Sequence, residues 1–163
     1  MDHIDLLQLH RVDPNVPLAD QIGVLKDMQD EGKIKHIGLS QVSVDQLKEA
    51  AAIAPIVSVQ NMYNLSNRQD EDVLDYADAH HIAFIPWFPL ATGELIKDAT
   101  LTNIAQKYNA SPAQIALAWL LKRSDVILPI PGTKSSDHEL QNIQAQDIDL
   151  SQADFDALKA LAK

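Results

Sequence analysis

The stretch Ile34-Lys35-His36-Ile37-Gly38-Leu39-Ser40 is a short apolar run that ends in a hydroxyl side chain and is followed by sequence with helical spacing. Four other runs of this kind lie at residues 4–10, 56–61, 82–87 and 126–131. Short, nearly continuous apolar runs are typical of strands buried in a parallel sheet, and helices between them are typical of α/β proteins. The sequence therefore predicts an α/β fold of five parallel strands with flanking helices.

The runs close on residues that are suited to chemistry. Their ends carry His10, Ser40, Gln60 and Trp87, and the turn Gly132-Thr133-Lys134 follows the last run. In parallel α/β folds, the carboxyl ends of the strands meet at one edge, where binding and catalytic sites are built. Periodicity alone does not choose between an open sheet of the flavodoxin-like kind and an arc of a (β/α)₈ barrel.

The segments between the runs have the features of helices. A serine or asparagine side chain at an N-cap accepts a hydrogen bond from the first helical turn, and such residues stand at Ser43, Asn67, Ser111 and Ser151. Gly32 is placed to end the first helix, since glycine adopts the left-handed backbone that often follows a helix. The spacing of apolar residues predicts helices at 44–53, 71–81, 101–108 and 112–123. It also predicts a helix that begins at Leu18 and ends at Gly32, a helix that follows the turn at 132–137 and ends near Ile143, and a last helix after Ser151.

The composition sets limits on function. The 163 residues include no cysteine, which excludes disulfides and thiolate metal sites, and the histidines and carboxylates show no metal-binding pattern. A net charge of −10 argues against a nucleic-acid partner, which usually meets a basic face. No apolar stretch is as long as a membrane span, and Met1-Asp2-His3 does not resemble the start of a signal peptide. We expect a single cytoplasmic domain over residues 1–163, with no metal and no membrane partner.

Five segments carry motifs in a characteristic order and spacing. They lie at residues 4–11, 32–40, 59–64, 86–90 and 130–133, and include Val59-Gln60-Asn61-Met62-Tyr63-Asn64 and Pro86-Trp87-Phe88-Pro89-Leu90. In these segments the chain resembles the aldo-keto reductase family, most closely its bacterial general aldo/keto reductases. The resemblance implies a partial (β/α)₈ TIM barrel, with this chain matching strands four to eight. It also implies NADPH-dependent reduction of aldehydes and ketones to alcohols.

The resemblance implies roles for the strand ends. The residue that matches His10 in the family positions and polarises the substrate carbonyl, and those that match Ser40 and Gln60 hydrogen-bond the nicotinamide carboxamide. Trp87 matches the aromatic residue that stacks on the nicotinamide ring. The residues after Trp87 match a loop that covers the pyrophosphate of the cofactor in the family, and the contacts expected from it are Phe88, Leu90 and Thr92. From the residues alone, each position also has a structural alternative, as a capped strand end or a core tryptophan.

The segment from Gly132 to Asn142 is the second expected cofactor region. Its backbone N–H groups and hydroxyls precede a helix, and a helix N-terminus is a ready site for an anion. The resemblance implies that this segment binds the 2′-phosphate and the adenine of NADPH. The expected contacts are Gly132, Thr133, Lys134, Ser136, His138, Gln141 and Asn142. His138 stands where many members have a phosphate-binding arginine, and the alternative for the whole segment is an ordinary capped helix.

The resemblance also implies what this sequence does not contain. In the family, the catalytic tyrosine, its aspartate partner and a lysine come from the first three strands, which have no counterpart here. We therefore expect the chain, as the C-terminal portion of such an enzyme, to bind NADP(H) and to turn over carbonyl substrates weakly or not at all. The alternative is a non-catalytic nucleotide-binding or regulatory module with the same fold. Because strands at the two edges would lack neighbours, we also expect self-association through exposed strand edges.

Overall fold

In the computed structural model, which describes residues 2–91 and 97–162, the chain folds as two compact units. The sheet unit comprises Met1–Asn61 and Asp70–Ile85, and the helical unit comprises Met62–Gln69 and Pro86–Lys163. The single domain expected from the sequence stays a prediction.

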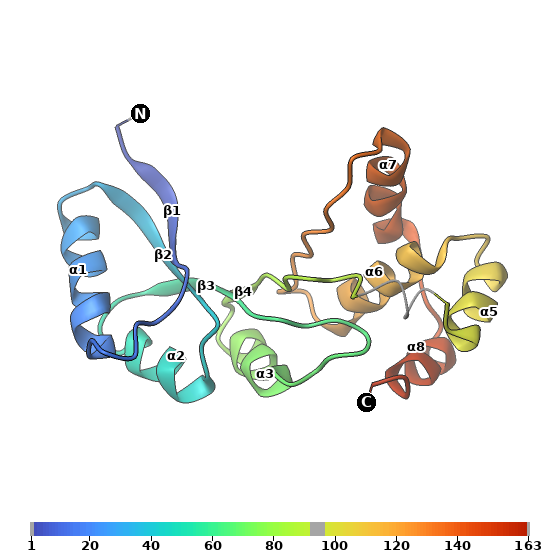
Figure 1. Ribbon diagram of the computed structural model, residues 1–163, viewed down its shortest axis with the longest axis horizontal. Helices are drawn as coiled ribbons and strands as arrows, with labels where there is room; N and C mark the ends of the chain where they lie inside the picture. Colours follow the sequence, from blue (N-terminus) through green and yellow to red (C-terminus); the bar gives the residue numbers. More distant parts are fainter. Residues whose placement is uncertain (1, 92–96, 163) are drawn as a thin grey trace. The chain divides into compact units, whose positions relative to one another are not determined.

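A four-stranded parallel sheet forms the centre of the sheet unit (Figure 1). Its strands lie side by side in the order β1 (Ile4–Leu9), β2 (Ile34–Ser40), β3 (Ile56–Gln60) and β4 (Ala83–Phe84). The connecting helices are α1 (Leu18–Asp30), α2 (Val44–Ala51) and α3 (Glu71–Ala79). This succession of strand, helix and parallel strand confirms the predicted α/β fold.

The side of the sheet that the helices cover holds the core of this unit. Ile37 and Leu39 of β2 have no exposed surface, and neither has Leu47 of α2. These side chains alternate along β2 with His36, Gly38 and Ser40, because successive residues of a strand point to opposite faces. Ile37 and Leu39 of β2 therefore point toward the helices, and His36 and Ser40 point to the opposite face of the sheet.

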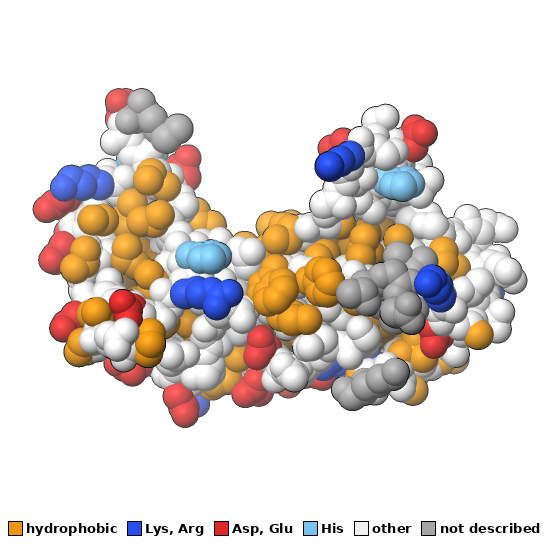
Figure 2. Space-filling view, in the orientation of Figure 1, with side chains coloured by type: hydrophobic (Ala, Val, Ile, Leu, Met, Phe, Trp, Pro, Cys, Tyr) orange, Lys and Arg blue, Asp and Glu red, His pale blue; other side chains and the backbone are white. Residues whose placement is uncertain are grey.

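Strand β1 has an open outer edge among the described residues. Its inner edge pairs with β2, and no described strand pairs with its outer edge. The apolar side chains of Ile4 and Leu6 are 43% and 39% exposed. Figure 2 shows hydrophobic side chains at the surface over β1 and α1. An open edge with apolar neighbours can accept another strand.

Three neighbouring strands come close together at Gly38. Gln8 of β1 donates a hydrogen bond from Nε2 to Oγ of Ser58 on β3, at 3.0 Å, and Gly38 of β2 lies opposite both residues in the ladder. A Cβ atom on Gly38 would lie 2.2 Å from that Ser58 oxygen and 2.8 Å from Cγ of Gln8. Glycine is therefore required at this position because there is no room for a side chain.

The helical unit is built around α6 (Pro112–Arg123). The remaining elements are α5 (Ala99–Lys107), α7 (Ser136–Gln144), the 3₁₀ turn η1 (Ala145–Asp147) and α8 (Gln152–Lys159). Trp119 of α6 has no exposed surface, and its ring stacks on that of Phe155 with centroids 5.4 Å apart. The Tyr63 ring lies 6.2 Å from Trp119, and the Arg68 guanidinium lies over the indole at 4.6 Å. Aromatic and cation–π contacts thus hold the segment Met62–Gln69 in this unit.

Most of the predicted helix boundaries are confirmed. The confirmed N-caps, each of which accepts a hydrogen bond from the first turn, are Ser43, Ser111 and Ser151. Gly32 follows α1 with φ at +75°, as expected of a glycine that ends a helix. Asn67 is not the N-cap of α3, which is Asp70, because the Asn67 side chain accepts from the N–H of Gln69 in the preceding turn.

The described residues form four strands where the sequence predicts five. Residues 126–131 contain only a single bridge residue, Ile127, and no described strand pairs with them over their length. Pro129 and Pro131 have no N–H to donate to a ladder, so this segment depends on its neighbours to become a strand. β4 is also shorter than its apolar run. Pro86, two residues after Phe84, has no backbone N–H to donate to a neighbouring strand.

None of the described helices is long and apolar enough to cross a membrane.

Candidate functional site

Three of the predicted site residues lie in a row at the carboxyl edge of the sheet. The ladder pairs Leu9 with Leu39 and Ser40 with Gln60. His10 is the next residue after Leu9, so the same register places it beside Ser40. Neighbouring strands lie about 4.8 Å apart, and paired residues share a face of the sheet. The sheet unit therefore brings these three predicted residues together.

The three side chains differ in the hydrogen bonds that they already make. Ser40 is buried, and its hydroxyl donates to the backbone carbonyl of Gln60 at 2.9 Å, which leaves its lone pairs to accept from a ligand. The Gln60 amide and the His10 ring make no hydrogen bond with any residue that the structure describes. Gln60 can therefore both donate and accept toward an amide, and the exposed His10 ring can donate from an N–H.

Asn61 ends the third apolar run, and it is a buried polar residue to which the sequence assigned no role. The Val42 N–H donates to its Oδ1 at 3.2 Å, and its Nδ2 donates to the Val42 carbonyl at 2.8 Å. Burial raises the pKa of the nearby Asp70 carboxyl, and the Asn61 side-chain amide partly opposes this effect. The one signal in the sequence is an amide side chain directly after Gln60 at a strand end, and its partner Val42 is 19 residues away.

In the helical unit, the loop that contains Phe88 has a strained backbone. Phe88 and Ala91 have φ values of +60° and +52°, a region that residues other than glycine rarely adopt. The buried Asn64 holds this loop, since its Nδ2 donates to the carbonyl of Phe88 at 3.0 Å. Strained residues persist where the surrounding structure fixes them, and they are common at functional sites.

The predicted contacts in this loop have different surroundings. Trp87 is half-buried and forms a parallel β-bridge with Met62. Its ring centroid lies 6.2 Å from that of the exposed Phe88. Leu90 is half-buried, and Thr92 lies outside the described residues. A half-buried indole keeps part of its surface for a flat ligand ring.

The segment that leads into α7 is organised by its own side chains. Oγ1 of Thr133 accepts from the N–H of Ser135 at 3.1 Å, and Oγ of Ser135 accepts from the N–H of His138 at 3.4 Å. Ser135 is therefore the N-cap of α7. The exposed predicted contacts are Gly132, Thr133, Lys134, Ser136, His138 and Gln141, whereas Asn142 is half-buried. Asp137 adds a carboxylate to the first turn, and this charge opposes an anion there.

A groove of about 610 Å³ lies beside this segment, between α6 and α7. Its apolar wall includes Leu117 of α6 and Ile143 of α7. Three predicted contacts line it as well, namely Gly132, Thr133 and Asn142. The other predicted contacts of the segment are not among its walls: Lys134, Ser136, His138 and Gln141.

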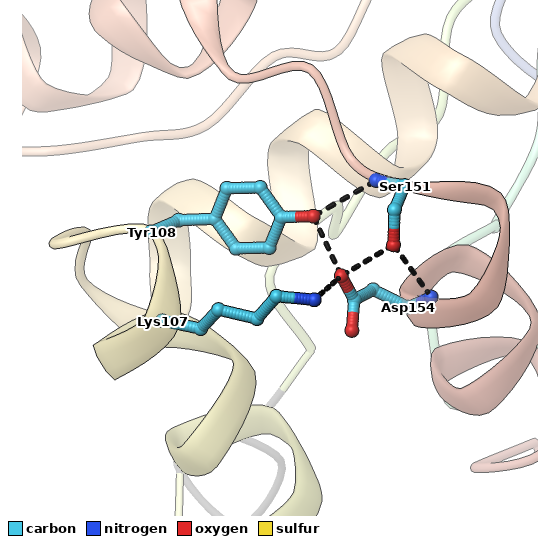
Figure 3. A network of polar contacts seen from close by, with 4 residues as sticks. All are labelled: Lys107, Tyr108, Ser151 and Asp154. Atoms are coloured by element: carbon cyan, nitrogen blue, oxygen red, sulfur yellow. Dashed lines mark hydrogen bonds and ion pairs between the residues drawn. The ribbon is translucent and has the colours of Figure 1, made fainter.

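A polar network joins the end of α5 to the start of α8 (Figure 3). Oδ2 of Asp154 accepts hydrogen bonds from Lys107, Tyr108 and Ser151, each at 2.6 Å. The Ser151 N–H donates to the Tyr108 hydroxyl at 2.8 Å. The Lys107 ammonium, followed by the two hydroxyl donors, lowers the pKa of Asp154 to about 2. Because every hydroxyl here is engaged with its neighbours, this network anchors a helix and offers no activated nucleophile.

The described residues contain no group of three or more His, Cys, Asp or Glu side chains that could hold a metal ion.

Comparison with known proteins gives a family match over the whole chain. The model described as "Aldo/keto reductase family" matches residues 1–163. An uncharacterised oxidoreductase of Schizosaccharomyces pombe is 52% identical over 153 residues, which cover 93% of this chain and 50% of that protein. Pyridoxine 4-dehydrogenase of Escherichia coli is 43% identical over 140 residues, which cover 86% of this chain and 49% of that protein. The chain thus spans about half the length of the curated relatives it matches.

Solved structures have the same fold. An aldo-keto reductase from Klebsiella pneumoniae, solved in complex with NADPH, matches with a TM-score of 0.86 and 28% identity, over 98% of this chain and 59% of that one. The thermostable aldo-keto reductase Tm1743, solved with the inhibitor epalrestat, matches with a TM-score of 0.89 and 28% identity, over 98% of this chain and 60% of that one. This likeness agrees with the predicted partial (β/α)₈ barrel.

Proposed function

Because the chain belongs to the aldo/keto reductase family, we propose that it serves the NADP(H)-dependent reduction of a small aldehyde or ketone. The observation that carries this proposal is the row of His10, Ser40 and Gln60 at the carboxyl edge of the sheet. The NADPH complex of the Klebsiella relative supports the choice of cofactor. Since the chain spans about half of its curated relatives, the proposal concerns the steps that these residues can serve.

In this proposal, the sheet unit serves the nicotinamide end of the cofactor and the substrate. The Gln60 amide donates to and accepts from the carboxamide, and the Ser40 oxygen accepts from it. When bound, NADPH supplies the hydride for the carbonyl carbon. An N–H of the His10 ring donates to the carbonyl oxygen and stabilises the negative charge that develops there.

The helical unit serves the rest of the cofactor in the same proposal. The half-buried Trp87 offers its ring face to the nicotinamide, and the loop at Phe88, Leu90 and Thr92 contacts the pyrophosphate. The segment before α7 binds the adenosine end, with Thr133 and Lys134 at the 2′-phosphate. Remaining contacts of this end are assigned to Gly132, Ser136, His138, Gln141 and Asn142. The charge of Lys134 and the free N–H groups of the helix start favour the phosphate, against the nearby Asp137.

We further propose that the 163-residue chain reduces carbonyl compounds slowly or not at all by itself. Hydride addition leaves an alkoxide, which must take up a proton to become the alcohol. His10 is placed to donate a hydrogen bond, and no described acid accompanies it in the row with Ser40 and Gln60. A nucleotide-binding or regulatory module with the same fold would also bind NADPH without turnover.

Binding and turnover are tested by titrating the chain with NADPH and following the fluorescence of the cofactor. We expect saturable binding, and we expect Gln60→Ala to weaken it about tenfold, because two hydrogen bonds to the carboxamide are lost. Gln106→Ala makes the same change at an exposed position of α5 and should leave the affinity unchanged. Failure to bind at millimolar NADPH would refute the cofactor proposal, and rapid reduction of aldehydes by the pure chain would refute the proposal of slow turnover.

Self-association through β1 is the remaining part of the proposal. The open outer edge and the exposed Ile4 and Leu6 support pairing with a second copy. In sedimentation experiments we expect dimers or larger species, and we expect Leu6→Lys to shift them toward monomers. Val24→Lys places the same charge at a position on α1 that is 54% exposed, and it serves as the control. A wild-type chain that is monomeric at every concentration would contradict this proposal.

A further inference from the structure

We propose that Asn61 is a positioning residue that holds Ser40 and Gln60 in place for the nicotinamide carboxamide. This inference rests on the proposed cofactor site, and it adds a residue that touches neither the cofactor nor the substrate. The hydrogen bonds that support it lie at the ends of β2 and β3, within the sheet unit.

The turn after β2 has a backbone that needs to be held. Gln41 has φ at +56°, a conformation in which the Cβ atom comes too close to the following carbonyl oxygen. The Gln41 side chain is exposed. The Gln41 N–H donates to the carbonyl of Gln60 at 3.1 Å, beside the hydrogen bond that the same oxygen accepts from Ser40. The end of β3 therefore fixes the first part of the turn.

Asn61 fixes the next part of the turn. Its side chain is 1% exposed and bonds both backbone groups of Val42, so that the amide takes the place of a neighbouring strand. Hydrogen bonds in a buried, apolar setting are costly to leave unmade. Because Asn61 directly follows Gln60, the dipeptide Gln60-Asn61 holds three consecutive residues of the turn, from Ser40 to Val42.

The two bonds to Val42 also fix the orientation of the Asn61 amide. The Asn61 side chain also interacts with the partly buried carboxylate of Asp70, the N-cap of α3, and lowers the pKa of that carboxyl against the larger effect of burial. The amide of Asn61 cannot rotate without losing its two bonds to Val42, in the turn that follows β2. The consequence is that Ser40 and Gln60 are held in the geometry that they need before any cofactor arrives. Such preorganisation increases affinity because less side-chain freedom is lost on binding.

The experiment compares two probes on the same variant. Asn61→Ala removes both bonds to Val42 and leaves Ser40 and Gln60 unchanged. We expect the dissociation constant for NADPH to rise about tenfold, as calorimetry would measure it, because two side chains must then be ordered on binding. The second probe is adenosine 2′,5′-bisphosphate, which carries only the adenosine end. We expect its dissociation constant to stay within about twofold of the wild-type value.

Two further variants control for nonspecific effects and for a loss of stability. Asn103→Ala makes the same change at an exposed position of α5 and should alter neither dissociation constant. If Asn61→Ala proves too unstable, it is combined with Gln41→Gly and compared with Gln41→Gly alone. Glycine tolerates the left-handed backbone at position 41 and so offsets part of the lost stability. The combined variant still lacks the amide of Asn61, so its NADPH affinity should remain about tenfold below that of its reference.

The outcomes separate this inference from the function on which it rests. A selective loss of NADPH affinity supports a positioning role for Asn61. An equal loss for both probes indicates a general loss of structure and overturns the inference, and so does an unchanged affinity for NADPH. If the wild-type chain binds neither probe, the proposed function fails, and the inference fails with it.

Discussion

Replacing Gly38 with alanine is expected to lower the free energy of unfolding by about 3 kcal/mol, among the largest losses of stability from adding a single methyl group. The new Cβ would lie 2.2 Å from Oγ of Ser58, far inside van der Waals contact. Ser58 is 2% exposed and cannot turn into solvent, and Gln8 would have to give up its bond to Ser58. Urea unfolding followed by circular dichroism measures the loss.

Another glycine provides the matched control for this substitution. Gly23 lies in α1, and nothing comes within 4 Å of a Cβ placed on it. Gly23→Ala should therefore stabilise the chain by about 1 kcal/mol, because alanine is the better helix former. Ser58→Ala removes the clashing oxygen and should recover part of the loss caused by Gly38→Ala. A Gly38→Ala variant as stable as the wild type would show that the three strands are not packed as described.

Replacing Trp119 with alanine is expected to cost about 4 kcal/mol, the largest loss for any single residue of the helical unit. The indole has no exposed surface, and its loss would leave a cavity among Tyr63, Arg68 and Phe155. It would also remove the hydrogen bond from Nε1 to the carbonyl of Phe155, at 3.3 Å. The measurement is again the urea midpoint, followed through the fluorescence of the remaining tryptophan.

The chain has only two tryptophans, and the second provides the comparison. Trp87 is half-buried, so Trp87→Ala should cost about 1 kcal/mol in stability while it weakens NADPH binding in the proposed site. Trp119→Phe keeps a stacking ring and should lose less than half as much stability as Trp119→Ala. Equal losses from Trp119→Ala and Trp87→Ala would contradict the position of Trp119 at the centre of this unit.

Features that depend on neighbouring residues in the sequence were predictable. The helix that begins at Pro112 is announced by Ser111 and by a glutamine three residues later, and both hydrogen bonds of this capping box are present. Strand β2 was also predictable, because the apolar residues and the length of its run indicate a strand without reference to the partner strands. The row of His10, Ser40 and Gln60 followed from parallel strands that begin a similar distance before these residues.

Features that depend on distant residues were not predictable. Residues 126–131 read as a strand, but a strand also needs a ladder, and the two prolines leave few donors for one. Asn61 was missed because its function in the fold is visible only once Val42 lies beside it. The requirement for glycine at position 38 likewise comes from Gln8 and Ser58, which belong to two other strands.

The division of the chain into units has a consequence for how such a molecule could arise or be dissected. The backbone passes from one unit to the other three times, after Asn61, Gln69 and Ile85. Neither unit is a contiguous stretch of the gene, so neither could have been gained by simple fusion of a ready-made module. For the same reason, no single proteolytic cut releases either one intact, and a fragment that ends at Ile85 would keep Tyr63 and Arg68 without the indole against which they pack.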